Sequence, residues 1–403
     1  MSRLPAADTA WLVMDHAANP MVVTAVLLLA RSVPAERLMA LMEARILSAF
    51  PPFRWRIGPD GYEEVAVDAA AHVDTLFADD DGEPGRVLED LVTAWASAPL
   101  DPDRPRWQLA TVHGPKPAVL ARVHHALGDG FALARVLLTL TDGAEAPPPQ
   151  PHAPHAAWSD VLAAPAALAK LLFTPDDRSP LHPALTGKKR FAWTRTWLLA
   201  DVADRAHAAG ATVNDALLAS LGGALARLLG ASGSVRAFVP VNLRPLDAPI
   251  PPTLGNRFGI VLVDLPLGGD DDARLAAVHA EMDRIKASPE AMVAFGLIEA
   301  LGVLPAEVER ALVESLFAPK AALVLTNVPG PKTPITLDGV PVTDVGFWVP
   351  QTGDVGLGVS LLSYAGRLSV GVSADEAVID ARALVEAFED ELSRWLGQED
   401  AVR

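Results

Sequence analysis

The stretch GAEAPPPQPHAPHAA, which begins at Gly143, separates two parts of the sequence that each carry their own strand and helix patterns. A segment this rich in proline and alanine suits a linker or a crossover better than a strand or a packed helix. At 403 residues the chain also exceeds the usual size of a single hydrophobic core. We therefore expect an N-terminal lobe over 1–142 and a C-terminal lobe over 191–403, joined by a crossover over 143–190.

Both parts mix short strand patterns with helical ones. Short apolar runs, many of them bounded by turn residues, indicate strands at 20–30, 107–114, 118–125, 238–245, 258–266, 322–331, 355–364 and 367–375. Helical spacing of apolar residues and capping residues indicate helices over 36–47, 131–140, 158–173, 212–230, 272–287, 306–316 and 381–396. The elements follow no fixed period, so the sequence predicts an α/β or α+β fold with mixed sheets flanked by helices.

Composition and charge exclude several classes of function. The net charge of −17 argues against nucleic acid as a partner, because phosphate binding needs concentrated lysine and arginine. It also argues against electrostatic docking on anionic lipid, so we expect any peripheral membrane contact to be hydrophobic. The chain has no cysteine, which excludes thiolate metal sites. No run is long enough for a membrane span and no secretion signal is evident, so a cytoplasmic location is expected.

The chain has ten histidines, and two of them stand together in VHHALGDGF, residues 123–131. On a strand ending at 125, successive side chains alternate, so His124 and His125 face opposite ways and do not form a simple two-ligand metal site. A neutral imidazole at a strand end suits proton abstraction near neutral pH. Asp129 would fix the local backbone or pair with an arginine, and Gly130 suits a turn position with positive φ.

HHALGDG resembles the HHxxxDG pattern of the CoA-dependent acyltransferases, a superfamily that includes chloramphenicol acetyltransferase and the condensation domains of peptide synthetases. Further blocks resemble its bacterial wax ester synthase/diacylglycerol acyltransferase branch: PLDPDRPRW at 99–107, TVNDALLA at 212–219, FVPVNLRP at 238–245, LGNRFG at 254–259 and LTNVPGP at 325–331. The blocks follow the family's order. Gln108, Asn242 and Thr326 depart from its pattern and the chain is somewhat short, which leaves the substrate range open more than the chemistry.

The resemblance implies a two-lobed fold with a substrate tunnel between the lobes. It implies no bound cofactor, with acyl-CoA as a co-substrate and a long-chain alcohol or diacylglycerol as acceptor, giving wax ester or triacylglycerol. On this chain His125 would be the general base, and the alcohol oxygen would attack the thioester directly, without a covalent acyl-enzyme. Asp129 would have a structural role, and our candidate for its partner is Arg244. His124 would pack on the other side of the strand.

The remaining blocks supply candidates with two interpretations each. Asn214 and Asp215 are interpreted as a helix start rather than as chemistry. Asn256 is either a substrate contact or a turn residue. Candidates to stabilise the oxyanion are Thr326 and Asn327. The basic triplet is either a contact for the CoA phosphates or a solvated loop, and it consists of Lys188, Lys189 and Arg190.

Two other functions stay open at this level. One is an acyltransferase that acts on a hydroxyl or amine of a specialised metabolite, and the other is a non-catalytic lipid-binding relative. The absence of a carrier-protein serine motif disfavours a condensation domain, and the complete HHxxxDG pattern disfavours a non-catalytic protein. Helix 158–173 would rest on lipid or pack between the lobes. The sequence predicts no particular oligomeric state.

Overall fold

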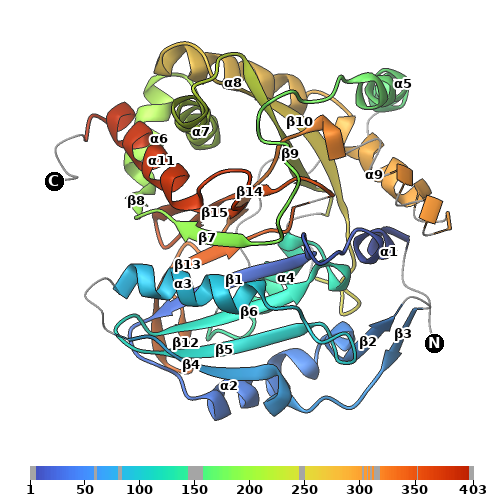
Figure 1. The fold of residues 1–403 in the computed structure, drawn as a ribbon, viewed down its shortest axis with the longest axis vertical. Coiled ribbons are helices and arrows are strands. Elements are labelled where there is room, and N and C mark those ends of the chain that lie inside the picture. The colour runs from blue at the N-terminus through green and yellow to red at the C-terminus, as the bar shows by residue number, and fades with distance from the viewer. Residues whose placement is uncertain are drawn as a thin grey trace.

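A computed structural model gives the fold of the chain (Figure 1). It describes residues 6–58, 61–79, 84–143, 158–244, 250–301, 318–351 and 353–398, together with 304–305, 307–308 and 311–312. The proline-rich part of the expected crossover, 144–157, lies outside the described residues, as does most of the helix expected over 306–316. None of the helices in the described ranges is both long and apolar enough to cross a lipid bilayer.

The first of two mixed sheets has the strand order β12-β13-β1-β6-β5-β4. Its strands are β1 Val22–Leu29, β4 Val73–Phe77, β5 Trp107–His113, β6 Ala118–His124, β12 Thr336–Leu337 and β13 Val340–Trp348. Only β4 and β5 pair in parallel. The helices around it are α1 Ala6–Val13, α2 Ala35–Leu41 with a π-helical extension Met42–Leu47, α3 Pro84–Ser97 and α4 Gly130–Leu138. A small hairpin joins β2 Trp55–Gly58 and β3 Gly61–Glu64. Single 3-10 turns cover Pro51–Arg54, Ala69–His72 and His125–Leu127.

The second sheet has the order β10-β9-β11-β14-β15-β7, and β8 also pairs with β15. Its strands are β7 Lys189–Trp193, β8 Trp197–Leu198, β9 Ser234–Asn242, β10 Phe258–Pro266, β11 Leu323–Pro329, β14 Leu357–Tyr364 and β15 Arg367–Asp375. β11 runs parallel to both of its neighbours. The helices of this half are α5 Trp158–Phe173, α6 Leu199–Ala208, α7 Val213–Leu229, α8 Asp271–Lys286, α9 Glu290–Leu301 and α11 Ala381–Leu396, and a 3-10 turn covers Ala318–Lys320.

The two halves of the chain are not separate in space. The sequence places 191–403 in one lobe, whereas β12 and β13 pair beside β1 in the first sheet. In Figure 1 β13 leaves the upper half of the molecule and completes the lower sheet. The physical reason is that β1 would otherwise be an open edge, and β13 pairs with it over most of its length. Residues 336–348 therefore belong to the first sheet and not to the lobe that the sequence predicts for them. For the rest of the chain, the division into lobes over 1–142 and 191–403 stays a prediction.

The main apolar core runs between the lobes. Every residue of β6 is buried, and this strand lies between β1 and β5. One core cluster joins Val123 of β6 to Phe238 of β9 and Phe347 of β13, so it spans both sheets. A second cluster fills the space under α7 and α11. Burial of apolar surface stabilises the folded state by roughly 25 cal/mol per Å². The core that surrounds the loop after β6 therefore also holds the two lobes together.

Most predicted elements are present. All the predicted strands occur with small changes at their ends, and α7 begins with the predicted cap, since Thr212 and Asp215 form a reciprocal capping box. Gly230 ends α7 in the left-handed conformation. Helices α1, α3, α6 and α9 were not predicted. Of these, α1 has the largest effect on the site, because it contacts the turn that carries His125.

Candidate active site

The loop after β6 carries the His-His-Asp-Gly residues. The strand ends at His124, a 3-10 turn covers His125–Leu127, and Asp129 caps α4 by accepting a hydrogen bond from the Ala132 amide at 2.8 Å. Gly130 is the first residue of α4 and does not have positive φ. The expectation of positive φ at Gly130 was wrong, because the aspartate turns the chain as a helix cap and the next residue is already helical.

His125 is enclosed where the two lobes meet, with 6% of its surface exposed. Its ring lies 4.1 Å from that of Trp11 in α1, and 5.9 Å from that of Phe258 in β10, measured between centroids. Burial lowers the pKa of His125 to about 4, against an opposing effect of the negative charge of Asp129. The imidazole is therefore uncharged at neutral pH, which is the state that a general base needs.

His124 has surroundings of its own, as the strand alternation predicts. It is 2% exposed, its Nε2 lies 3.2 Å from Asp15 Oδ2, and its Nδ1 accepts a hydrogen bond from the Ala126 amide at 3.1 Å. Asp15 also accepts from the Met21 amide at 2.9 Å. Burial lowers the pKa of His124, and the hydrogen bond to Asp15 opposes this. These contacts fix the backbone of the loop.

Asp129 and Arg244 form an ion pair in which both side chains are buried. The partner that the sequence suggested is therefore the one in contact. Asp129 Oδ2 also accepts from the Arg257 amide at 3.0 Å. Breaking a buried pair from one side leaves a charge without a counter-ion, at a cost of about 3–5 kcal/mol. The pair joins the histidine loop of the first lobe to the loop after β9 in the second.

Arg244 also holds the backbone of the loop before β10. Its guanidinium donates to the carbonyls of Leu254 and Gly255, which both have positive φ. Positive φ at a leucine costs on the order of 1–3 kcal/mol and persists only where neighbours enforce it. Gly255 in turn bridges to Gly128 of the histidine loop. One arginine thus fixes both loops that meet at His125.

Asn256 lies in this loop and is 8% exposed. Its side-chain amide donates to the carbonyl of His125 at 3.0 Å and to Asp8 Oδ1 at 2.7 Å. Its backbone amide donates to the same oxygen of Asp8 at 2.8 Å. Of the two interpretations, substrate contact or turn residue, the described contacts favour neither, because Asn256 binds the backbone of the histidine itself.

Thr326 and Asn327 follow one another in β11 and face different ways. Thr326 is buried and lies between Val324 and Val328 in the alternation, on the face that joins the interlobe core. Asn327 is exposed and donates to Asn214 at 3.3 Å. Only Thr326 is therefore on the side of the site. Ser360 of β14 is the register partner of Thr326 in β11. Within the described ranges the Ser360 hydroxyl is buried without a hydrogen-bond partner.

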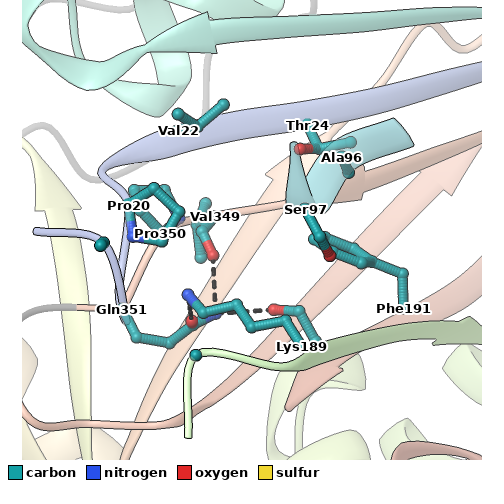
Figure 2. Close-up of a pocket in the computed structure, with 13 residues that line it drawn as sticks. Pro20, Val22, Thr24, Ala96, Ser97, Lys189, Phe191, Val349, Pro350 and Gln351 are labelled. Atoms are coloured by element: carbon teal, nitrogen blue, oxygen red, sulfur yellow. Dashed lines mark hydrogen bonds between the residues drawn. The ribbon is translucent and has the colours of Figure 1, made fainter. Parts of the chain in front are cut away.

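The basic triplet does not form one surface. Lys189 points inward and is 9% exposed, and its ammonium donates to the side-chain oxygens of Asn19 and Gln351. Figure 2 shows this side chain beside Gln351 in a small pocket near Val349. Burial lowers the pKa of Lys189 to about 7. Lys188 and Arg190 are exposed, 3.0 Å from Glu376 and 2.6 Å from Asp90 respectively. The hypothesis of a phosphate contact therefore does not hold for Lys189.

An apolar pocket lies beside the histidine loop. It contains about 720 Å³ of empty space, part of it open to solvent. Its walls come from β1, β6, α4, the end of β11, β13 and β14, with Ala121, Phe131, Ala134, Val328 and Phe347 among the lining residues. Ala121 of this pocket and Trp11, whose ring packs on His125, belong to the same apolar core cluster. The continuous tunnel stays a prediction, of which this pocket would be one part.

Two neighbours of His125 are not predicted from the sequence. One is Trp11, which packs on the ring, and the other is Asp8, which is connected to the His125 carbonyl through Asn256. Both residues belong to MSRLPAADTAW, which was considered only as a possible secretion signal. Their spacing of three places them on one face of a helix, and that was the available signal. In the part of the chain that the structure describes, no group of three or more histidine or acidic side chains is arranged to hold a metal ion.

The comparisons with known proteins agree with this geometry. Residues 4–171 match the wax ester synthase/diacylglycerol acyltransferase catalytic domain, and residues 254–395 match the C-terminal domain of the same family. A Mycobacterium tuberculosis protein named as a diacylglycerol O-acyltransferase is 30% identical over 341 residues, 73% of this chain and 72% of that protein. A second one, named tgs1, is 26% identical over 379 residues, 83% of this chain and 81% of that protein.

A solved structure shows the same fold. The wax ester synthase/diacylglycerol acyltransferase from Marinobacter aquaeolei VT8 superposes with a TM-score of 0.71 and 21% identity, over 99% of this chain and all of that one (100%). The first condensation domain of the CDA synthetase gives 0.63 at 16% identity, over 99% of this chain and 95% of that one. The chain therefore belongs to the wax ester synthase/diacylglycerol acyltransferase family of acyl-CoA-dependent O-acyltransferases.

Proposed function

We propose that His125 is the general base with which this chain transfers a fatty acyl group from acyl-CoA to the hydroxyl of a long-chain alcohol or of diacylglycerol. The observation that carries the proposal is an imidazole kept uncharged by burial at the junction of the lobes. An apolar pocket, lined in part by Phe131 of α4, lies beside the loop that carries this imidazole. The products are wax ester or triacylglycerol, together with free CoA.

In the proposed step, Nε2 of His125 takes the hydroxyl proton while the alcohol oxygen bonds to the thioester carbonyl carbon. The tetrahedral intermediate then collapses, the carbon–sulfur bond breaks, and the imidazolium gives its proton to the leaving sulfur. One thioester and one alcohol become one ester and one thiol, with no covalent acyl-enzyme. The low pKa of the free base rises as negative charge develops on the neighbouring carbonyl oxygen.

The apolar pocket supports a hydrocarbon chain as the group that is bound. The side chains that line this pocket are mostly apolar, as is usual for sites that bind lipid-like ligands. Burying a methylene is worth about 0.8 kcal/mol, so a long chain supplies much binding energy without any hydrogen bond. Phe131, in α4 directly after the Asp-Gly pair, lines this pocket and so joins the chain site to the histidine loop.

Thr326 is our candidate for stabilising the oxyanion. Its hydroxyl is on the interlobe face, and Val328, two residues further along β11, lines the apolar pocket. A hydroxyl donor aimed at the developing oxyanion lowers the barrier by about 2.7–4 kcal/mol in well-studied sites. Replacement by valine keeps the shape of the side chain and removes the donor, so we expect kcat to fall more than KM.

Two surface features support further contacts, one with the phosphates of CoA and one with a lipid surface. Lys188, just before β7, and Arg190, within it, are both exposed and would contact the phosphates of CoA. Phe173, at the end of α5, is 83% exposed and Leu168 of the same helix is 37% exposed, so α5 would contact a lipid surface through these apolar side chains. Flotation with a triacylglycerol emulsion tests the second feature: Phe173→Ser should weaken binding, and equal binding of both proteins would refute it.

The experiment that tests the proposed function measures the release of CoA from palmitoyl-CoA with hexadecanol, with diacylglycerol and with no acceptor. We expect release only when an acceptor is present, with formation of the matching ester. Release of CoA without acceptor, together with a palmitoylated protein in mass spectra, would contradict direct attack. No ester with either acceptor would contradict the proposed acceptor class.

A further inference from the structure

Asp8 is a buried carboxylate close to the proposed base. It lies in the first turn of α1, is 3% exposed, and accepts two hydrogen bonds from Asn256. Among the described residues no cation forms an ion pair with it, because Arg244, whose charge favours the ionised form of Asp8, pairs with Asp129 instead. Burial raises the pKa of Asp8 to about 6, so it is ionised at neutral pH. A buried charge paired only with one amide side chain and its backbone is costly, and such sites are often functional.

The contacts of Asn256 fix the orientation of its side-chain amide. Both partners of Nδ2, the Asp8 carboxylate and the His125 carbonyl, are acceptors, so the NH₂ group must face them. The amide oxygen then points elsewhere, and in the described part of the chain it is buried without a hydrogen-bond partner. Nδ1 of His125 is likewise buried without a hydrogen-bond partner among the described residues.

The hydrogen bond that the structure shows between Asn256 and His125 is to the backbone carbonyl of the histidine, while Nδ1 of the ring has no partner among the described residues. Burial is the main influence on the pKa of His125, and hydrogen bonding by its own carbonyl and by the Asn256 side chain partly opposes it. The same Asn256 residue holds that carbonyl through Nδ2. If the unpaired amide oxygen of Asn256 accepts from Nδ1, the proton of the neutral ring is on Nδ1 and the lone pair is on Nε2.

From these contacts we propose that Asp8 and Asn256 are positioning residues for His125. Asp8 locks the amide of Asn256, and Asn256 selects the tautomer with the proton on Nδ1, so that Nε2 is free to accept the proton of the alcohol. A base oriented by a third group is the arrangement that other nucleophilic and acid–base sites use. The inference rests on the proposed role of His125. Neither residue touches substrate in this arrangement.

The test compares wild type with Asp8→Asn, which keeps the shape of the side chain and removes its charge. A matched control is Asp338→Asn, since Asp338 pairs with Arg37 at the surface and has φ of 52°, which asparagine tolerates. Three quantities are measured: kcat and KM for palmitoyl-CoA with hexadecanol, the melting temperature, and the tautomer of His125 by nitrogen NMR with isotope-labelled histidine. The spectrum of His125→Ala assigns the signal.

We expect Asp8→Asn to lower kcat at least about tenfold, equivalent to about 1.4 kcal/mol, with little change in KM. Its His125 should change from the Nδ1–H tautomer to a mixture, while the protein melts no lower than wild type. Wild-type kcat in Asp8→Asn would overturn the proposal. So would a lower kcat with an unchanged tautomer and a lower melting temperature, which marks a purely structural role. Full activity in His125→Ala would instead refute the proposed base, whatever Asp8 does.

Discussion

Replacing Asp129 by alanine should unfold this protein more easily as well as inactivate it. The carboxylate has two structural functions, since one oxygen caps α4 and the other pairs with the buried Arg244. Losing the pair costs about 3–5 kcal/mol. Losing a helix cap costs about 1 kcal/mol. Together they remove a large part of the 5–15 kcal/mol that is usual for a folded domain.

Matched variants separate the two contributions. Asp129→Asn keeps an oxygen that can cap α4, so it should be more stable than Asp129→Ala by about 1 kcal/mol. Adding Arg244→Met to Asp129→Ala removes the unpaired guanidinium, so the double variant should regain stability relative to the single one. Arg244 would otherwise keep only the carbonyls of Leu254 and Gly255 as partners among the described residues.

Urea unfolding followed by circular dichroism measures these differences as changes in the free energy of unfolding. The reasoning would be refuted if Asp129→Ala unfolded within about 1 kcal/mol of wild type and yet had no activity, since that result assigns Asp129 a chemical role. It would also be refuted if the double variant were less stable than Asp129→Ala alone.

The apolar pocket, the buried Asp8 and the exposed basic pair each lead to a separate prediction. Ala134→Phe, which narrows the apolar pocket from α4, should lower kcat/KM for palmitoyl-CoA about tenfold and for octanoyl-CoA much less, and equal losses would show that the acyl chain lies elsewhere. Because burial raises the pKa of Asp8 to about 6, above its unfolded value, its contribution to stability is present at acid pH and is lost as pH rises through 6. Between pH 7 and pH 5 wild type should therefore gain about 1 kcal/mol over Asp8→Asn in urea unfolding, and parallel curves would contradict this. Replacing Lys188 and Arg190 together with alanine should raise KM for palmitoyl-CoA with little change in kcat, and an unchanged KM would rule out the phosphate contact.

The strands and most helices of this fold could be predicted because their signals are local. The run AVLARVH is apolar enough to identify β6, and the Thr212–Asp215 box identifies the start of α7 without any knowledge of tertiary structure. The pairing of Asp129 with Arg244 was also accessible, because family resemblance suggested an arginine partner and its VNLRP block contained one. Each of these predictions depends either on residues that are close together in the sequence or on a pattern shared with the family.

What could not be predicted depends on contacts between distant segments. Asp8 and Asn256 are 248 residues apart, and no local pattern shows that they meet. The position of β13 beside β1 has the same origin. The sequence leaves the basic triplet as either a phosphate contact or a solvated loop, but strand alternation in β7 turns Lys189 inward while its neighbours stay exposed. The histidine loop and its arginine partner could thus be predicted from the sequence, whereas the contacts that distant segments make with them could not.

In the proposed mechanism His125 removes the proton of the acceptor alcohol, and every other role in the site depends on this step. The decisive measurement is the rate of ester formation from palmitoyl-CoA and hexadecanol by His125→Ala and His125→Gln, with circular dichroism confirming that both are folded. We expect both folded variants to lose activity by about 10²-fold or more, as is usual when a general base is removed. Activity near that of wild type in either folded variant would contradict the mechanism and place the base elsewhere.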